Sequence, residues 1–329
     1  MRKPGETSPG PGNTVSNWKS SIEQGEYRRK TSHFRDWICP EEGTPFKAEA
    51  GRYHLFVSLA CPWAHRTLIF RELKQLQDIV GVSVVHPEML EQGWSFEHSA
   101  DSAQAYGTTG DTLNGRSHLR EYYLDSETDY RGTVSVPVLW DRQKNCIVNN
   151  ESSEIIRMFN SAFDHLSDNR DDYYPAALRA EIDEINALIY SAINNGVYKT
   201  GFATTQEAYA RHCATLFEVL DELEQRLSKQ RYLAGRQMTE ADWRLFTTLV
   251  RFDAVYHTHF KCNVRQLREY PSLHNHTLEL YQYPGIAKTV HMPHIKHHYY
   301  ASHRSLNPSG IVPLGPEQDW SANHQRHLL

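Results

Sequence analysis

Apolar residues recur with two different periods in the first half of the chain. The stretch YHLFVSLA (53–60) is short, apolar and β-prone, which is typical of a buried strand. The segment after it has helical spacing in four apolar residues, Leu68, Ile69, Leu73 and Leu76. A second apolar run, VGVSVVHPE (80–88), indicates another strand. A strand, a helix and a strand in this order predict a βαβ unit, in which the two strands pair in parallel.

The segments that follow complete an α/β domain. A long polar stretch, 89–132, has few periodic signals, and we expect a functional or disordered loop there. The segments VSVPVLWD (134–141) and CIVNN (146–150) predict two strands joined by a turn, and ESSEIIRMFN (151–160) predicts a helix. These patterns predict a domain over residues 51–165 that carries a long loop insertion.

Beyond the break at DDYYP (171–175) the pattern becomes helical. One apolar stripe runs through 177–196, where Asn195–Gly196 predicts a stop, and another runs through 206–230. Thr239 and Asp242 form a predicted capping box at the start of a further helix. The tail from Tyr299 onward holds too much Pro and Gly for a helix. We therefore expect an all-helical domain over 172–329 that ends in an irregular C-terminal tail.

Residues 1–50 form an N-terminal extension without a clear period. The first twenty residues are rich in Gly, Pro, Ser and Thr, so we expect them to be poorly ordered. Residues 21–50 mix charged and apolar side chains, which predicts an extension that wraps around the domain.

Composition narrows the class of protein. The 329 residues suffice for two ordinary domains, and 39% hydrophobic with 23% charged residues is a normal globular mixture. A net charge of −5 provides no basic field for nucleic acid or an anionic membrane. No apolar run is long enough to span a bilayer, and no apolar core follows the basic N-terminus. Five widely spaced cysteines, an odd number, favour free thiols in the reducing cytoplasm.

One of these cysteines, Cys61, lies where the first strand turns into a helix, in SLACPWAHR (58–66). Pro62 suits the first turn of that helix. Unpaired N–H groups at a helix start, with Arg66 nearby, predict a lowered pKa for the Cys61 thiol. A buried, inert cysteine is the alternative, and we favour it for the other four. Ala64 stands where a C-x-x-C pair has its second thiol, so an outside thiol, most simply glutathione, must resolve a mixed disulfide on Cys61.

Two other segments have features of a site for a small peptide. A cis Val136–Pro137 bond at a strand entrance would leave the preceding backbone free to pair with a bound peptide, although trans is the commoner isomer. The helix start at Glu151 and Ser152 offers N–H groups and a hydroxyl to a carboxylate, and Glu151 could take an ammonium group. By spacing alone, a plain helix cap is slightly favoured over this binding role.

A histidine cluster raises the question of a metal site. Its members are His291, His294, His297 and His298. Their spacing could place some of them on one helical face, but no carboxylate or cysteine lies nearby in sequence, and Pro293 interrupts a helix there. We therefore expect no bound metal.

Taken together, these pieces resemble the cytosolic glutathione transferases, and most closely the glutathionyl-hydroquinone reductases, also called the Xi class. The matching stretches span most of the chain: CPWAHR (61–66), GWSF (93–96), SVPVLWD (135–141), NNESSEI (149–155), NNGVYKTGFATTQEAY (194–209), DWRLFTTLVRFDAVYHTHFKCN (242–263), IKHHYYASH (295–303) and NPSGIVPLGP (307–316). The resemblance implies an α/β thioredoxin-like N-terminal domain plus an all-α glutathione-transferase C-terminal domain. It also implies a homodimer.

The resemblance implies how glutathione, as a cosubstrate, would bind. Its sulfur would face Cys61, and no tightly bound cofactor or metal is implied. Glu151 and Ser152 would hold the γ-glutamyl end, and the Val136 backbone, before Pro137, would hold the cysteinyl part. The glycyl end would lie on Trp94 and Arg131.

The resemblance also implies the reaction: S-glutathionyl-hydroquinones would be reduced to hydroquinones through a mixed disulfide between Cys61 and glutathione. Three tyrosines would line the acceptor pocket, namely Tyr198, Tyr256 and one of Tyr299 and Tyr300. Their phenolic donors would stabilise the negative charge that develops on a ring oxygen. An omega-like thiol transferase or dehydroascorbate reductase would use the same cysteine, and a non-catalytic scaffold with the transferase fold is a third interpretation.

Overall fold

A four-stranded mixed sheet forms the centre of the N-terminal part of the molecule. The computed structural model describes residues 21–329, so the prediction for residues 1–20 lies outside the described residues. The strand order is β4-β3-β7-β8, and the strands are β3 (Tyr53–Val57), β4 (Val80–Val84), β7 (Val138–Asp141) and β8 (Cys146–Asn149). β3 pairs in parallel with β4, as predicted, and antiparallel with β7, which pairs antiparallel with β8.

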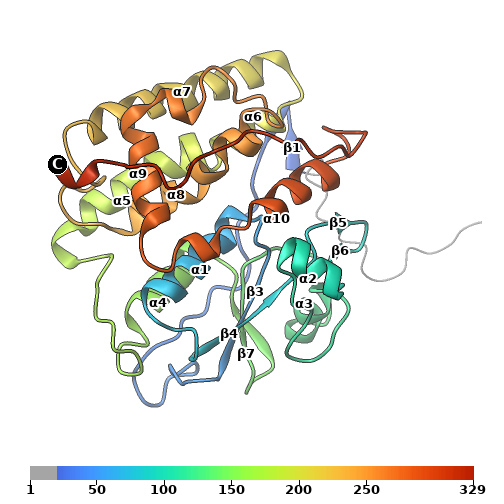
Figure 1. Cartoon of the computed structure of the whole chain (residues 1–329). Helices are drawn as coiled ribbons and strands as arrows, with labels where there is room; N and C mark the ends of the chain where they lie inside the picture. Colours follow the sequence, from blue (N-terminus) through green and yellow to red (C-terminus); the bar gives the residue numbers. More distant parts are fainter. Residues whose placement is uncertain (1–20) are drawn as a thin grey trace, which may run out of the picture.

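Helices cover this sheet and connect it to the rest of the molecule. Helix α1 (Pro62–Leu73) packs against α4 (Ser152–Ser161) and against α8 (Glu240–Arg251) of the helical part (Figure 1). Helix α3 (Arg120–Ser126) contacts β8. The arrangement is the thioredoxin-like one that the resemblance implied. The predicted strand 134–141 begins only at Val138, because a cis Val136–Pro137 bond precedes it and proline has no N–H for the ladder.

The stretch 89–132 corrects one prediction, since it holds four short elements where we expected a loop. They are β5 (Met89–Leu90), β6 (Gly93–Trp94), α2 (Ala100–Tyr106) and α3. Helix α2 has no buried residue, and its start is fixed by a capping box between Ser99 and Ser102. Such a helix leaves no apolar period in the sequence, which explains why the pattern did not indicate it.

The C-terminal part is helical, as predicted. Its elements are η2 (Ala176–Leu178), α5 (Arg179–Ile189), η3 (Tyr190–Asn194), α6 (Gly196–Gly201), α7 (Gln206–Leu227), α8 (Glu240–Arg251), η4 (Phe252–Tyr256), η5 (Leu267–Glu269), α9 (Pro271–Gln282), η6 (Ala287–Thr289), α10 (Met292–His297), η7 (His298–Ser302) and η8 (Arg326–Leu328). The capping box of Thr239 and Asp242 starts α8, which confirms that prediction.

Three predicted helix limits in this part are wrong. Asn195–Gly196 does not stop the chain, because the π-helix η3 leads directly into α6. Pro293 does not interrupt a helix; it lies in the first turn of α10, where a proline loses no hydrogen bond. The helical conformation also continues past Tyr299 to the end of η7, so the irregular tail begins later than expected. The limits predicted for the domains themselves stay predictions.

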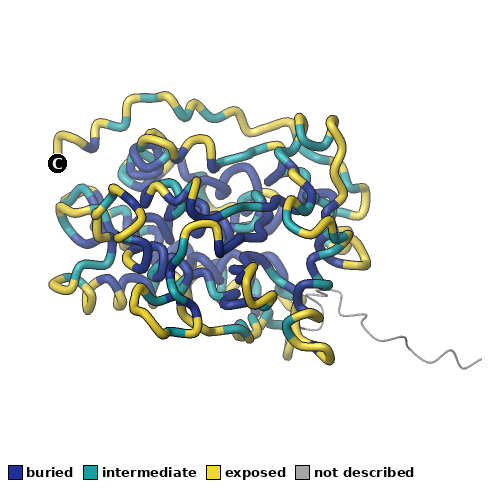
Figure 2. The backbone as a smooth tube through the Cα atoms, turned by 90° about the horizontal axis from the view of Figure 1, so that it is seen from below, coloured by how far each residue is buried: buried dark blue, intermediate teal, exposed yellow. Residues whose placement is uncertain are grey.

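Residues 21–50 lie along both parts of the molecule. The hairpin of β1 (Ile22–Glu23) and β2 (Glu26–Tyr27) lies on the helical part, where the Thr204 N–H donates to the Gly25 carbonyl at 3.0 Å. Farther along, Ile38 joins the buried core around the sheet. Figure 2 shows that the buried backbone fills the middle of the molecule, while the C-terminal tail runs along its outside. No helix among the described residues is long and apolar enough to cross a membrane.

Candidate active site

The Cys61 thiol lies at the N-terminus of α1, as the sequence predicts. Cys61 is the N-cap residue, and its sulfur accepts a hydrogen bond from the Ala64 N–H at 3.5 Å. The thiol donates to the carbonyl of Val136, 3.4 Å away, just before the cis peptide bond. The predicted thiol and the predicted peptide-binding backbone therefore meet at one point.

The prediction of a lowered pKa for this thiol is wrong. Burial raises the pKa of Cys61 above its ordinary value. The N–H groups of Ala64 and Trp63 and the charges of Arg251 and Arg29 lower that pKa, but they offset only part of the effect. A helix N-terminus favours a thiolate, yet removing the sulfur from water disfavours the charged form more strongly here.

Arg251, at the end of α8, supports the loop that carries the thiol. Its guanidinium donates to the carbonyls of Ala60 and Leu59, each at 2.9 Å, and lies 2.9 Å from the His65 ring. The side chain is fully buried. Sequence reasoning missed this residue because its partners lie far away along the chain. The available signal was a charged residue at the end of an otherwise apolar helix stripe.

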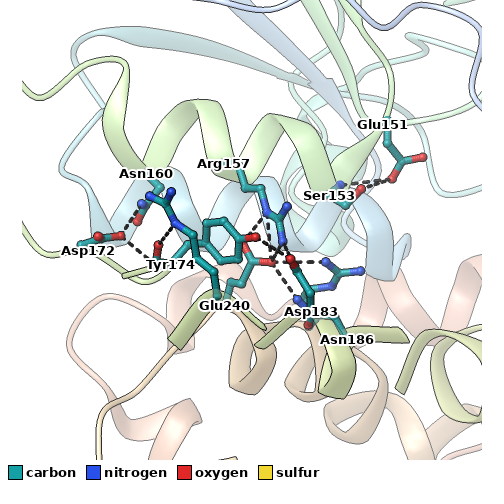
Figure 3. Close-up of polar contacts among 11 residues, drawn as sticks. Glu151, Ser153, Arg157, Asn160, Asp172, Tyr174, Asp183, Asn186 and Glu240 are labelled. Atoms are coloured by element: carbon teal, nitrogen blue, oxygen red, sulfur yellow. Dashed lines mark hydrogen bonds and ion pairs between the residues drawn. The ribbon is translucent and has the colours of Figure 1, made fainter. Parts of the chain in front are cut away.

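Glu151 and Ser152 lie together at the start of α4. Glu151 is the N-cap: its carboxylate accepts from the Ser153 N–H at 3.1 Å and from the Ser153 hydroxyl at 2.9 Å, as Figure 3 shows. The other carboxylate oxygen accepts from Ser32 at 2.9 Å. Although burial opposes ionisation, these hydrogen bonds and the charge of Arg66 hold the pKa of Glu151 below its usual value. The capping role that we weighed for this segment is thus present, with the carboxylate ionised.

A polar network fixes α4 against the helical part. Arg157, farther along the same helix, donates to Glu240 of α8 at 2.8 Å and to Asp183 of α5 at 2.5 Å, and it lies 3.7 Å from the centre of the Tyr174 ring (Figure 3). Glu240 is fully buried and also accepts from Asn186 at 2.8 Å. The network therefore joins α4 to two helices of the helical part, α5 and α8.

Three tyrosines from distant segments form one hydrogen-bonded cluster. The Tyr299 hydroxyl lies 2.6 Å from that of Tyr198 and 3.1 Å from that of Tyr256. Tyr300 points elsewhere, because its hydroxyl donates to the Ala254 carbonyl at 3.1 Å. Of the two candidates, the geometry therefore selects Tyr299. Burial raises the pKa of all three clustered phenols, and Tyr198 and Tyr256 both interact electrostatically with the thiol of Cys61.

Each of these tyrosines lies in a π-helical turn or in the helix that follows one. Tyr198 follows η3 by one helical turn, Tyr256 is the last residue of η4, and Tyr299 lies within η7. π-Helical turns are rare, and they occur frequently at functional sites because the extra residue redirects the side chains around it. Three of them around one cluster of hydroxyls indicate that the backbone is adapted to this site.

The two residues predicted for the glycyl end of glutathione, Trp94 and Arg131, differ in their surroundings. Trp94 is buried, and its ring stacks on His298 with centroids 5.0 Å apart. Arg131 is exposed. The structure therefore places Trp94 beside the C-terminal segment, and the role of Arg131 stays a prediction.

Two arginines flank Trp63, and sequence reasoning missed the first of them. Arg29, from the N-terminal segment, lies 4.7 Å from the Trp63 ring centre, and Arg66 lies 4.6 Å from it. Two consecutive asparagines accept from them: Asn195 from Arg29 at 3.1 Å, and Asn194 from Arg66 at 2.7 Å. Residues 21–50 show no periodicity, so the sequence held no signal for Arg29.

The ring nitrogens of the four histidines near the C-terminus contact other protein groups and do not converge on one point. His291 accepts from the His294 backbone N–H at 3.2 Å. His294 lies 3.1 Å from the Ser58 hydroxyl, His297 lies 2.8 Å from Glu88, and His298 lies 2.7 Å from the Pro87 carbonyl. Within the part of the chain that the structure describes, no three His, Cys, Asp or Glu side chains group as metal ligands. These contacts join the C-terminal segment to the thioredoxin-like part.

Comparisons with known proteins agree with this geometry. Residues 60–162 match the family model of the glutathione S-transferase N-terminal domain, and residues 206–277 match that of the C-terminal domain. The chain is similar to glutathionyl-hydroquinone reductase YqjG of Escherichia coli, with 53% identity over 92% of this chain and 93% of the relative. It is also similar to glutathionyl-hydroquinone reductase PcpF of Sphingobium chlorophenolicum, with 48% identity over 89% and 91% of the two chains. An omega-like glutathione S-transferase of Schizosaccharomyces pombe is 48% identical over 92% and 96%.

Solved structures resemble the fold equally well. The glutathione-bound structure of YqjG from Escherichia coli has a TM-score of 0.86 and 52% identity, covering 90% of this chain and 96% of that one. The Xi glutathione S-transferase of Phanerochaete chrysosporium has a TM-score of 0.85 and 51% identity, covering 90% and 94%.

Proposed function

Since this chain belongs to the glutathione transferases, and within them to the glutathionyl-hydroquinone reductases of the Xi class, we propose that it reduces S-glutathionyl-hydroquinones to hydroquinones. Glutathione is the cosubstrate. The observation that carries the proposal is the combination of a lone thiol at a helix N-terminus with a buried cluster of three tyrosine hydroxyls. A thiol alone suits many reductions, whereas phenolic donors beside it suit a substrate with ring hydroxyls.

Glutathione is held with its sulfur against Cys61. The Val136 backbone forms hydrogen bonds with the cysteinyl part of glutathione. The Val136 carbonyl already lies 3.4 Å from the Cys61 thiol, where that part would bind. Glu151, kept ionised, binds the γ-glutamyl ammonium group, and Ser152 binds the neighbouring carboxylate at the start of α4. Trp94 and Arg131 take the glycyl end, which requires Arg131 to approach the site when the ligand binds.

In the first chemical step, the Cys61 thiolate attacks the glutathionyl sulfur of the conjugate. A sulfur–sulfur bond forms and the bond between sulfur and the ring carbon breaks. A bare ring carbanion is a poor leaving group, so the conjugate reacts as its keto tautomer, in which that carbon already carries a proton. The electron pair of the broken bond then passes to the carbonyl oxygen as the ring becomes aromatic again, so the hydroquinone leaves as a phenolate, which takes up a proton.

The tyrosine cluster stabilises this oxygen as its charge develops. Tyr198, Tyr256 and Tyr299 remain neutral donors because burial raises the pKa of each. Prearranged donors of this kind reduce the barrier, and removing one of them costs on the order of a hundredfold in rate. Tyr300 lies outside the cluster and supports it from the backbone side.

In the second step, another glutathione thiolate attacks the glutathione sulfur of the mixed disulfide. Oxidised glutathione leaves and the Cys61 thiolate returns. One conjugate and one glutathione thus give one hydroquinone and one oxidised glutathione. Residue 64 is alanine, so no internal thiol competes with this step. We expect a cytoplasmic homodimer that needs no metal and no tightly bound cofactor.

A thiol transferase or dehydroascorbate reductase is the second candidate, favoured by the similarity to an omega-like transferase. It would use the same Cys61 thiol and the same glutathione site. The two functions differ in whether the tyrosine hydroxyls act on the acceptor, and that difference is measurable.

The test is incubation of the protein with glutathionyl-menadiol and glutathione, with chromatographic measurement of free menadiol. We expect catalytic release, and we expect Cys61→Ser to lose at least about a thousandfold, because a serine hydroxyl is a far weaker nucleophile toward sulfur. A wild-type protein that reduces simple glutathione mixed disulfides but releases no menadiol would favour the thiol transferase instead.

A further inference from the structure

The N-terminal segment delivers one cationic side chain, Arg29, to the space between the two halves of the site. The hairpin before it is anchored on the helical part by the bond between Thr204 and Gly25 and by the Tyr27 ring, which lies 5.3 Å from that of Phe202. Arg29 follows directly after this anchor. Its position is therefore set by packing of the segment on α6, and not by a free surface loop.

The Arg29 guanidinium lies over two aromatic rings of the site. Its central carbon is 4.7 Å from the Trp63 ring centre and 4.9 Å from that of Tyr198. Its Nε donates to Asn195 at 3.1 Å. Trp63 is two residues from the reactive thiol, and Tyr198 belongs to the hydroxyl cluster. Arg29 thus lies between the nucleophile and the phenolic donors, and its charge attracts the Cys61 thiolate.

A comparison with Arg66 shows what is unusual about Arg29. Both guanidinium groups lie on Trp63, and each is held by one of two consecutive asparagines. Arg66 is 1% exposed and uses its two Nη atoms on Ser152 at 3.4 Å and Asn194 at 2.7 Å. Arg29 is half-buried, and its two Nη atoms have no hydrogen-bond partner among residues 21–329. Arg66 is therefore a structural arginine, whereas Arg29 offers two charged donors to a ligand.

We propose that Arg29 is a further catalytic residue, which donates from its Nη atoms to the ring oxygen of the hydroquinone beside Tyr198. The inference rests on the proposed function. It adds no chemical step: the electron pair of the broken carbon–sulfur bond ends on that oxygen, and Arg29 stabilises the phenolate until it takes up a proton. A guanidinium stays charged at every working pH and presents a fork of donors, so it stabilises an anion more strongly than a neutral phenol does.

Through Arg29, the N-terminal segment contributes to the substrate specificity of the enzyme. Help from a cation matters most when the leaving phenolate is a strong base. Arg29 therefore extends the range of substrates toward hydroquinones of weak acidity, which carry no electron-withdrawing substituents.

The test compares Arg29→Gln with Arg28→Gln on two substrates. Arg28 is the neighbouring residue, largely exposed and paired with Glu23 at 3.2 Å, so its variant is a matched control. The substrates are glutathionyl-menadiol and the mixed disulfide of glutathione with 2-mercaptoethanol, which presents no ring oxygen. We expect Arg29→Gln to lose about tenfold to a hundredfold in kcat/KM for menadiol release. We expect a clearly smaller loss in disulfide reduction, which reports only the contribution of Arg29 to the Cys61 thiolate. Arg28→Gln should resemble the wild type on both substrates.

Two outcomes would overturn the proposal: equal losses of Arg29→Gln on both substrates, or unchanged menadiol release. Across conjugates of graded phenol acidity, the loss must also be largest for the weakest acids. If Arg29→Gln melts below the assay temperature, Arg29→Lys, which keeps the charge and loses the fork, must show the same selective loss to a smaller degree. A wild-type protein that releases no menadiol would instead refute the proposed function.

Discussion

The thiol half and the tyrosine half of the site are built in different ways. Cys61, Val136 and Glu151 each lie at the beginning of a helix or a strand around one small sheet. Their positions follow from local rules, because caps and strand entrances are set by residues a few positions away. Tyr198 and Tyr299 come from helices about a hundred positions apart, and they meet only through the packing of the helical part.

This difference decides what sequence reasoning could find. The strand-to-helix junction at Cys61, the cap at Glu151 and the capping box at Thr239 were all predicted from spacing and residue type. The tyrosines were indicated only by resemblance to a family, since a tyrosine on a helix is more often a packing residue. The choice between Tyr299 and Tyr300 depended on a π-turn, which leaves no sequence pattern.

Burial also explains why the pKa predicted for Cys61 was wrong. The prediction of a lowered pKa for Cys61 took into account only the helix N-terminus, which is a local effect. The raised pKa found in the structure comes from desolvation by burial, which depends on how the chain packs around the thiol. Arg29 and Arg251, the cations that lower this pKa most, are likewise distant from Cys61 along the chain. The pKa of a buried group can therefore be predicted only when the tertiary structure is known.

The largest expected effect separates the two halves chemically. Tyr198→Phe removes one phenolic donor and leaves the thiol half intact. We expect kcat for hydroquinone release to fall about a hundredfold, because an oxyanion donor is lost. Reduction of a glutathione mixed disulfide should change little. The measurement is steady-state kinetics of both reactions on the same preparation.

Tyr300→Phe is the matched control for this prediction. Its hydroxyl donates to the Ala254 carbonyl and lies outside the cluster, so hydroquinone release should stay within the wild-type range. Equal losses of Tyr198→Phe in both reactions would mean that the two halves act as a single structural unit and that the assigned role is wrong.

A smaller effect concerns the thiol half alone. Only the thiolate reacts with iodoacetamide, and burial raises the pKa of Cys61. Alkylation of Cys61, followed by mass spectrometry, should therefore be slow at neutral pH and rise about tenfold per pH unit below that pKa. Glutathione should protect the residue. A rate that is already constant between pH 6 and about 8 would show that the helix N-terminus and the arginines outweigh desolvation.

The smallest expected effect on hydroquinone release comes from Ala64→Cys, which restores a C-x-x-C pair. The Ala64 N–H lies 3.5 Å from the Cys61 sulfur, so a thiol at residue 64 is within reach of the mixed disulfide. Ala64 is fully buried, and one added sulfur atom should cost about 1 kcal/mol of stability. The first turnover uses Cys61 and the tyrosines, which the substitution leaves unchanged, so its rate in a stopped-flow experiment should resemble that of the wild type.

The second half of the catalytic cycle, in which the mixed disulfide is resolved, should follow a different route in Ala64→Cys. In the wild type the mixed disulfide persists until a second glutathione arrives, whereas in Ala64→Cys the new thiol expels glutathione and leaves a disulfide between residues 61 and 64. Mass spectrometry after a single turnover should then detect free reduced glutathione and a protein two mass units lighter than its dithiol form. Retention of glutathione on Cys61 in this variant would show that the alanine is not what makes the second glutathione necessary.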